Sequence, residues 1–411
     1  MLLFKIAMRN LVRYTRRTLL MVSLIAISTV FVLVFISVTT SFKNMMIGQI
    51  TDSMMGHIQV HRKGYTASID NLPLTISLQT EHIKKLEKII YNTQGIEDYS
   101  ERIKFAGIFS NFIESTGIRL NAVDPEKEFK TIPMLTSRII EGQKNLKKGE
   151  ILLPLLLAKG MNVKIDDPVV IIVTNKDGSV NGKQFKVEGI LESAVGPSGR
   201  DGYIHIDDGI EILRMEKPEI SEVAFRLKDI NKLHQIKKKL QQELAGNSDK
   251  KGKAIFEVHS WEDLHPFYNI VSMINMMIFF VNLMLILIVL ISVMNVMIMA
   301  VYERMREIGT LTAIGTLPGK IRSLFLLEGI FIGLGGALIG DVLSIIIILI
   351  LRYMKITFSF GRTEGLILSP SVDFFNILTI SVILIIISAL ASLQPAIKAS
   401  QLDPVTALRH V

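Results

Sequence analysis

Four long apolar segments divide this sequence. They cover residues 18–42, 267–301, 324–351 and 374–397. About 20 consecutive apolar residues cross the hydrocarbon core of a bilayer as a helix, so each segment is predicted to be a transmembrane helix. The third contains Asp341, which we expect to face another helix or water, because a central lipid-facing carboxylate costs about 2.5–3.5 kcal/mol. The chain is therefore predicted to be an integral, α-helical membrane protein.

The first two membrane helices are predicted to be longer than a bilayer requires. Beyond the first apolar segment, apolar residues continue at three- to four-residue steps: Met45, Met46, Ile50, Met54 and Met55. This periodicity is that of a helix, so the first helix is expected to cover 18–55. The second, over 263–302, includes an uncharged run that would extend about 55 Å as a helix, against a core of about 30 Å. Both are expected to project from the membrane as stalks.

Between these two helices lies a segment, 56–262, that shows both strand and helix patterns. Its first part, 56–110, reads as a strand at 57–61, a helix at 81–92 with Thr80 as N-cap, and a strand near 98–110. Its last part, 215–262, repeats this order with a strand at 221–227, a helix at 231–244 with Asp229 as cap, and a strand at 254–260. The two strand–helix–strand units are expected to pack side by side.

The middle of that segment, 111–214, is rich in strand and turn signals and is predicted to form a β-rich insert. Its clearest feature is a hairpin at 168–191. The residues expected to mark its tip are Lys176, Asp177, Gly178, Asn181 and Gly182. The predicted fold class is thus four transmembrane helices with a large α+β domain inserted between the first and the second.

Basic residues predict the orientation of the chain. Residues 1–17 contain five Lys or Arg residues and no acid, and such segments stay in the cytoplasm. With four spans, the connection at 303–323 and the tail at 398–411 are then also cytoplasmic, whereas the loop at 352–373 lies outside. The net charge of +8 is attributed to this topology and to anionic lipid. Nucleic acid is not an expected partner, since no recognisable nucleic-acid module is present.

The connection at 303–323 is a charged stretch between two apolar helices, and its apolar residues Ile308, Leu311 and Ile314 recur at helical spacing. It is predicted to form a short helix along the cytoplasmic surface that ends near Gly315 and Pro318. A helix in this place is suited to receive a push from a soluble partner. The alternative, an ordinary solvated loop, accounts for the charges but not for the apolar spacing.

No catalytic or metal site is predicted. The sequence GTLPGKI at 315–321 lacks both the glycine spacing and the hydroxyl residue of a nucleotide-binding P-loop, so any ATP hydrolysis must come from another subunit. His57 and His61 share one face of a predicted strand, but a zinc site needs more ligands, and both are expected to be exposed sheet residues. The chain has no cysteine, which excludes disulfides and thiol catalysis. No bound cofactor is expected.

Small residues in the third span repeat at a spacing that lets membrane helices approach closely. The two pairs are Gly329 with Gly333 and Gly336 with Gly340, followed directly by Asp341. We expect these residues to form a helix-packing interface, either within the chain or with a second permease copy. The alternative is that glycine is simply frequent in membrane spans.

Three motifs resemble the FtsX-like permease domain of MacB-type ABC transporters. ERMREIGTLTAIG at 303–315, followed by Glu328, resembles that family's coupling region; QPAIKASQLDPVTALRHV at 394–411 is similar to its terminal sequence, and IAMRNLVRYTRRTLL at 6–20 to its N-terminal helix. Total length, and GHIQVHRKGY at 56–65, are more similar to the lipoprotein-releasing LolC and LolE permeases of this family.

The resemblance implies a multi-pass permease of the bacterial inner membrane, with both termini cytoplasmic and the inserted domain periplasmic. It implies a homo- or heterodimer with a second permease and two copies of a cytoplasmic ABC ATPase that carry ATP and Mg. The expected ATPase-coupling residues are Glu303, Arg304, Arg306, Glu307, Gly309, Thr310, Ala313 and Gly315. The chain itself is then not an enzyme, and the stalks carry the ATPase stroke to the periplasmic domain.

The function implied is extraction of lipoproteins from the outer leaflet of the inner membrane for a LolA-like periplasmic carrier. In LolC a hairpin engages the carrier, and the segment 174–186 is the corresponding candidate here. Two alternatives stay open: MacB-like efflux with a membrane-fusion partner, and FtsX-like signalling to a cell-wall hydrolase.

Overall fold

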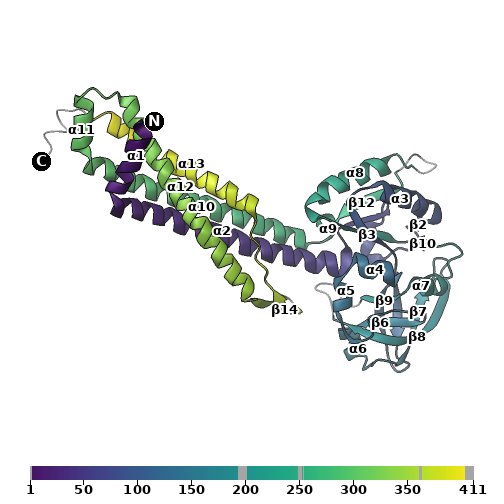
Figure 1. Ribbon diagram of the computed structural model, residues 1–411. Coiled ribbons are helices and arrows are strands. Elements are labelled where there is room, and N and C mark those ends of the chain that lie inside the picture. The colour runs from purple at the N-terminus through teal and green to yellow at the C-terminus, as the bar shows by residue number, and fades with distance from the viewer. Residues whose placement is uncertain (1, 193–200, 249–251, 253, 361–362, 403–411) are drawn as a thin grey trace. The chain divides into compact units, whose positions relative to one another are not determined.

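The computed structural model describes residues 2–192, 201–248, 252, 254–360 and 363–402. It divides into two compact units (Figure 1). The first, the helical unit, comprises Met1–Asn44, Val271–Phe358 and Gly365–Val411. The second, the head, comprises Met45–Ile270 and Ser359–Glu364. The predicted C-terminal motif at 394–411 lies partly outside the described residues.

The helical unit contains the four predicted membrane helices. Its helices are α1 (Leu2–Arg13), α2 (Thr15–Ile50), α10 (Phe267–Glu303), α11 (Met305–Ala313), α12 (Pro318–Tyr353) and α13 (Phe374–Ser400). Of these, α2, α10, α12 and α13 are long and apolar enough to cross a membrane, which confirms the prediction. Their shared core includes Met21, Val293, Phe325 and Leu384, one from each helix.

Three details of this unit differ from prediction. α12 begins at Pro318, within the predicted loop, because proline is well placed in the first turn of a helix. The link from α11 to α12 is therefore only residues 314–317. The stretch between α12 and α13 contains two short strands that the sequence did not reveal, β13 (Thr357–Phe360) and β14 (Thr363–Ile367), which pair with each other.

The head is built on one mixed sheet with the order β12-β1-β11-β3-β4-β9-β6-β8-β5, and β7 pairs with β3 and β8. The strands are β1 (Ile58–Arg62), β3 (Ile96–Ser110), β4 (Ser115–Val123), β5 (Ile139–Gly142), β6 (Glu150–Pro154), β7 (Pro168–Thr174), β8 (Val180–Leu191), β9 (Asp201–His205), β11 (Glu222–Leu227) and β12 (Phe256–Ser260). A separate pair consists of β2 (Leu78–Gln79) and β10 (Glu219–Ile220).

The strands of the two predicted strand–helix–strand units do lie side by side, since β1 pairs with both β11 and β12, and β11 pairs with β3. The head helices are α3 (Thr80–Asn92), α4 (Pro125–Thr131), α5 (Met134–Ser137), α6 (Leu155–Gly160), α7 (Ile206–Ile212), α8 (Leu233–Ala245) and α9 (Trp261–Leu264). The N-cap of α3 is Gln79, in a capping box with His82, and not Thr80 as predicted. Asp229 caps a 3₁₀ turn, Ile230–Lys232, that leads into α8.

The first membrane helix reaches the head through a π-helix, Thr51–Met55. Two contacts within the head and one backbone conformation hold this segment. Asp52 pairs with Arg226 of β11 at 2.7 Å, and Arg138, which follows α5, donates to the Ser53 carbonyl at 2.8 Å. Gly56 ends the π-helix with a φ of +73°, a conformation that favours glycine. The segment is thereby tied to strands and helices from both ends of the sheet.

A candidate coupling site where α1, α11 and α12 meet

The short helix α11 has a defined start and a defined stop. Arg304 is its N-cap residue, and the preceding helix α10 ends at Glu303. At the other end, the amide of Gly315 donates to the Thr312 carbonyl and the amide of Thr316 to the Leu311 carbonyl, both at 3.0 Å. This is the Schellman arrangement, and Gly315 adopts the left-handed φ of +93° that it needs. The helix ends where the sequence predicted.

The predicted ATPase-coupling residues fall into two groups. Those exposed on the surface of this unit are Glu303, Arg306, Thr310, Ala313 and Gly315. Arg304 is only 4% exposed, Gly309 is buried, and Glu307 is half-buried. Arg304 and Gly309 are thus packed inside their own chain, whereas the five exposed residues are accessible on the surface of this unit.

Arg304 is buried because it belongs to a polar cluster that joins three helices. We call this cluster the joint; its members are Asn10, Arg13, Tyr14, Arg17, Glu303, Arg304, Glu307 and Glu328. α1 and α11 lie at the same end of the helical unit in Figure 1. The joint takes residues from α1, from the beginning of α2, from the α10–α11 boundary and from α12.

Glu328 is the centre of the joint. It is fully buried, and its two carboxylate oxygens accept from the Arg304 guanidinium at 3.0 and 3.1 Å. The Asn10 side-chain amide also donates to it, at 2.8 Å. A carboxylate without water needs such partners, because an unpaired buried charge is costly. Glu328 thus holds α12, the start of α11 and α1 together.

A second set of contacts connects α1 directly to α11. The Tyr14 hydroxyl donates to Glu307 at 3.0 Å, and Arg13 pairs with the same carboxylate at 3.2 Å. The Arg304 guanidinium lies over the Tyr14 ring at 5.2 Å and over the Phe325 ring at 5.6 Å, within the range of cation–π attraction. A displacement of α11 must therefore move α1 and α12 or break these contacts.

The predicted helix-packing glycines are used inside the chain, and by two different helices. A Cβ added to Gly329 or Gly333 would lie within 3 Å of Ser392 or Ser388 of α13. A Cβ on Gly336 or Gly340 would lie 2.6 Å from Ile25 or 2.5 Å from Thr29, both on α2. Asp341 accepts from Ser381 of α13 at 2.8 and 2.9 Å, so it faces another helix.

The hairpin predicted to contact a carrier is folded against the head. Its turn, 175–179, contains Lys176, Asp177 and Gly178, whereas Asn181 and Gly182 lie within β8 and not at the tip. Lys176 pairs with Glu219 at 3.0 Å, and the Asn181 side chain donates to the Ile212 carbonyl at 2.9 Å. The hairpin tip is thus tied to β10, and the adjoining strand β8 is tied to the end of α7.

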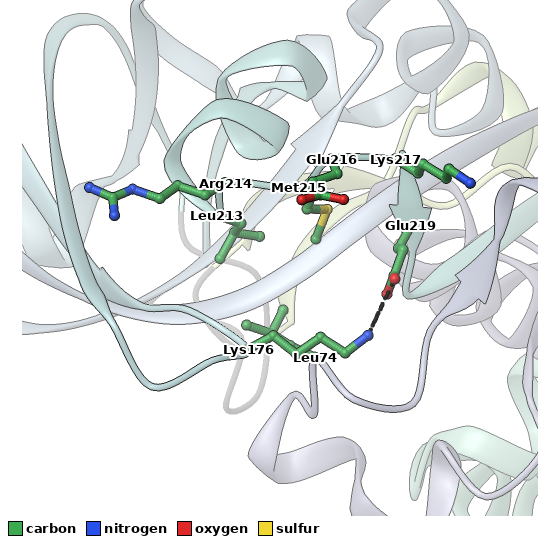
Figure 2. A pocket seen from close by; sticks show the side chains of 8 residues that line it. All are labelled: Leu74, Lys176, Leu213, Arg214, Met215, Glu216, Lys217 and Glu219. Atoms are coloured by element: carbon green, nitrogen blue, oxygen red, sulfur yellow. Dashed lines mark hydrogen bonds and ion pairs between the residues drawn. The ribbon is translucent and has the colours of Figure 1, made fainter.

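A pocket of about 350 Å³ lies beside this hairpin (Figure 2). The Lys176–Glu219 ion pair lies along one side of it, and Met215 projects between Leu213 and Glu219 in Figure 2. The lining residues are Leu74, Lys176, Leu213, Arg214, Met215, Glu216, Lys217 and Glu219. The lining mixes charges of both signs with three apolar residues and contains no set of groups arranged for catalysis.

The head contains a buried charge cluster around Arg102. This residue is 2% exposed and pairs at 2.8 Å with both Glu128 and Glu222, which are fully buried. Burial would raise the pKa of Glu222, but Lys104, His61 and Arg102 together hold that pKa well below 4.5. Burial would lower the pKa of Arg102, but its two carboxylate partners raise it. Glu222 and Arg102 therefore stay ionised at neutral pH.

The two histidines expected to be exposed are buried. His61 is fully buried and lies 3.4 Å from Glu222, and the His57 ring accepts from the Leu227 amide at 2.9 Å. The prediction failed because β1 is an inner strand with neighbours on both sides. Among the described residues, no group of three or more metal-ligating side chains is assembled.

Sequence reasoning missed the part that α1 plays. Its basic residues were used only to predict the orientation of the chain, yet Arg13 pairs with Glu307, and Arg17, at the start of α2, lies 3.9 Å from Glu303 and 4.0 Å from Glu328. The one available signal was Glu328, an acid in an otherwise apolar span, which requires a cationic partner nearby. Nothing in the sequence indicated that α1 contributes to it.

Four membrane-length helices, a large α+β head between the first two, and a short helix joined to α1 and α12 define the architecture of this membrane protein. Residues 18–243 match the MacB-like periplasmic core domain, and residues 279–404 match the FtsX-like permease C-terminal domain. The chain belongs to the MacB- and FtsX-like family of ABC transporter permeases. The matched core domain makes the head a MacB-like periplasmic domain.

Relatives of this chain include lipoprotein-releasing permeases. The lipoprotein-releasing system transmembrane protein LolC of Neisseria meningitidis is 22% identical over 96% of this chain and 94% of LolC. LolE of Haemophilus influenzae is 21% identical over 83% of this chain and 84% of LolE. Among solved structures, the periplasmic region of MacB from Actinobacillus actinomycetemcomitans is 12% identical with a TM-score of 0.35, over 50% of this chain and 89% of that region.

Proposed function

We propose that this chain is the permease subunit of an ATP-driven transporter that extracts lipoproteins from the outer leaflet of the bacterial inner membrane. The observation that carries the coupling part is the joint, which connects a surface helix to two other helices. The lipoprotein part rests on the similarity to LolC and LolE over most of the chain. A soluble ABC ATPase binds α11 on the cytoplasmic side, and a second permease completes the transporter.

The ATPase contact is made by the exposed side and C-terminal end of α11. Ile314 is 79% exposed and Leu317 63% exposed at the C-terminal end of α11, and the cation Arg306 is exposed in its first turn. Large apolar side chains with a charged rim are typical of interface anchors. The exposed members of the predicted coupling set, Glu303, Arg306, Thr310, Ala313 and Gly315, are distributed along α11 and at its two ends.

The stroke then passes from α11 into the membrane helices through the joint. Glu307 transfers it to α1 through Tyr14, and Arg304 transfers it to α12 through Glu328. At the far end of the first membrane helix, the π-helix is tied to Arg226 and Arg138. Movement of α2 is thereby delivered to the head, which releases cargo to a periplasmic carrier without moving it through the bilayer.

Reconstitution tests the transport reaction. The permease, its ATPase and a triacylated lipoprotein are placed in proteoliposomes, and nucleotide is added in the presence of a soluble lipoprotein acceptor. Release that depends on ATP supports the proposal. If no lipoprotein reaches the acceptor while ATP is hydrolysed, lipoprotein release is wrong, and efflux with a membrane-fusion protein or signalling to a hydrolase becomes the function to test.

A matched pair of variants tests the ATPase contact. Ile314→Asp places a charge in the centre of the exposed apolar end of α11, and the ATPase should no longer co-purify. Tyr353→Asp, at an 88% exposed position at the other end of α12, should leave co-purification unchanged. Equal retention of the ATPase by both variants would show that α11 is not the contact.

Labelling of single cysteines tests the orientation. The chain has no cysteine of its own, so Arg306→Cys and Tyr91→Cys each give one reactive thiol. An impermeant maleimide should reach position 91 in intact spheroplasts and position 306 only after the membrane is opened. Labelling of both positions from the same side would exclude transmission across the membrane.

A further inference from the structure

A second pocket of the head, of about 450 Å³, is lined mainly by side chains that donate hydrogen bonds. Its walls come from three places: Gln94 and Gly95 in the turn before β3, Lys228 and Asp229 directly after β11, and one face of α8. We call it the lysine pocket. It shares no lining residue with the pocket beside the hairpin, and the coupling site does not use it.

The backbone around the lysine pocket brings these three walls together. The Lys228 amide donates to the Gly95 carbonyl at 3.0 Å, which joins the turn to the end of β11. Gly95 has a φ of +103°, and a Cβ added there would lie 2.8 Å from the buried Ile236 side chain of α8, so the turn approaches the helix closely because it is glycine. The α8 residues of the lining recur at three- and four-residue steps, which places them on one face of the helix: Lys232, Gln235, Ile236 and Lys239.

The lining has more positive than negative charge. Three lysines and one aspartate, Asp229, give it a formal charge of +2. Asp229 is already used, because its carboxylate accepts from the Asn231 amide at 3.0 Å and caps the 3₁₀ turn. A pocket lined by one sign of charge concentrates the electric field and attracts ions of the opposite sign.

The three lysines are free to bind an anion. Lys239 lies 3.8 Å from Glu243, and both side chains are partly exposed, so this contact holds it weakly. Within the described part of the chain, neither Lys228 nor Lys232 forms an ion pair. The neighbouring Lys237, which does not line the pocket, instead pairs with Asp263. The unpaired cations are thus those that converge on the pocket.

The donor set indicates the chemistry of the ligand. A lysine ammonium and a glutamine side-chain amide both donate, so the pocket offers three cations together with the donors of Gln94 and Gln235. A carboxylate supplies a single charge. A phosphate monoester carries a charge of about −1.5 to −2 and three strong acceptor oxygens, and lysine binds phosphate as a point charge. Several lysines around one pocket therefore match phosphate better than carboxylate.

From these observations we propose that the lysine pocket binds a phosphate-bearing anion of at least two negative charges, held by Lys228, Lys232 and Lys239. Free phosphates and lipid phosphate headgroups share this chemistry. The proposal concerns the head alone and does not depend on ATPase coupling or on the identity of the cargo.

Calorimetric titration tests the ligand class and its source. The full permease in phosphatidylcholine nanodiscs is titrated with inorganic pyrophosphate, with soluble dihexanoyl phosphatidic acid and with acetate, and empty nanodiscs serve as the blank. We expect saturable binding of at least one phosphate compound that weakens as sodium chloride is raised, and no binding of acetate. Binding of pyrophosphate supports a free phosphate as ligand, and binding of phosphatidic acid alone supports a lipid headgroup. Absence of saturable binding by both, or equal binding of acetate, overturns the proposal.

A matched pair of double variants tests the lysines. Lys228→Gln with Lys232→Gln should weaken binding by about tenfold or more, since loss of one charge-assisted hydrogen bond already corresponds to about that factor. The control, Lys88→Gln with Lys238→Gln, removes the same charge at exposed positions of α3 and α8 that do not line the pocket, and should bind as the wild type does. Equal weakening by both double variants would mean attraction by net charge alone and would contradict the proposal.

A charge added to the lining gives an independent test. Gln235→Glu places a carboxylate in the pocket and should also weaken binding, whereas Gln242→Glu, at an exposed position of α8 outside the lining, should not. The single tryptophan, Trp261, is buried in the head, and its fluorescence reports whether each variant is folded. Unchanged affinity in folded Gln235→Glu would count against the pocket as the binding site.

Discussion

Replacement of Glu328 by glutamine removes one charge from the joint and almost nothing of its shape. The Asn10 side chain can still donate to the new amide oxygen. The Arg304 guanidinium, however, loses the carboxylate that it contacts at 3.0 and 3.1 Å, while remaining 4% exposed. Its one remaining acidic neighbour is Glu307 at 3.4 Å.

The magnitude follows from the burial of the pair. Removal of one member of a buried ion pair typically costs about 3–5 kcal/mol, because the other charge is left without compensation. For Glu328→Gln we expect a cost of about 3 kcal/mol, at the lower end of this range, because Glu307 offsets part of the lost interaction with Arg304. This corresponds to roughly a hundredfold change in the ratio of docked to undocked α1. The control Glu303→Gln changes a side chain that is 49% exposed and lies 3.9 Å from Arg17, a long and partly exposed contact that is expected to be worth about 0–1 kcal/mol.

A cross-link between α1 and α12 measures this ratio. The Phe4 and Phe331 rings are 4.8 Å apart, so cysteines at both positions of this cysteine-free chain should react with a short bismaleimide. The cross-linking rate should fall strongly in Glu328→Gln and stay unchanged in Glu303→Gln. ATPase co-purification should persist, while stimulation of ATP hydrolysis by substrate is lost. Wild-type cross-linking and wild-type stimulation in Glu328→Gln would refute the role given to the joint.

Further outcomes are expected elsewhere in the chain. Tyr14→Phe deletes one hydroxyl and should weaken coupling by about 1 kcal/mol without loss of the bound ATPase, as measured by substrate-stimulated ATP hydrolysis. Gly336→Ala should lower the free energy of unfolding of the purified permease by about 1–3 kcal/mol, because the added methyl group overpacks against α2. Gly335→Ala, where the nearest neighbouring atom is 3.7 Å from the added Cβ, should leave it unchanged. Arg102→Met leaves two carboxylates buried and should cost the head about 3–5 kcal/mol, visible as faster hydrogen exchange in β3 and β11. Because the pKa of Glu222 is lowered on folding, its contribution is present above pH 4.5 and is lost as the pH falls through the folded pKa, so protection of β11 amides should decrease with acid; protection that rises with acid would contradict the sign.

The fold was largely predictable because each membrane helix is encoded by a long continuous run of apolar residues. Runs of apolar residues located α2, α10, α12 and α13, and the Gly315 stop located the end of α11. In the head, the alternation of apolar and polar residues located β1, β3, β11 and β12. Alternation is a property of consecutive residues within one strand. These features depend on local periodicity, and each could be recognised without knowledge of its partner.

The site was only partly predictable because its contacts connect distant parts of the chain. Asn10 and Glu328 are 318 positions apart, and no local pattern connects them. The charges of α11 were identified, but Arg304 and Arg306 look alike in sequence, although one is buried and the other exposed. The same limit applies to His61, which appeared exposed because the strands on both sides of β1 lie about 160 residues or more away.

The four packing glycines of α12, Gly329, Gly333, Gly336 and Gly340, affect the order in which the helices can pack during biogenesis. Gly329 and Gly333 are covered by α13, and Gly336 and Gly340 by α2. During synthesis, α2 is available as soon as α12 enters the membrane, but α13 has yet to leave the ribosome. Gly329 and Gly333 are therefore covered only after α13 has entered the membrane. A chain that ended before α13 would leave the Gly329 surface open to lipid.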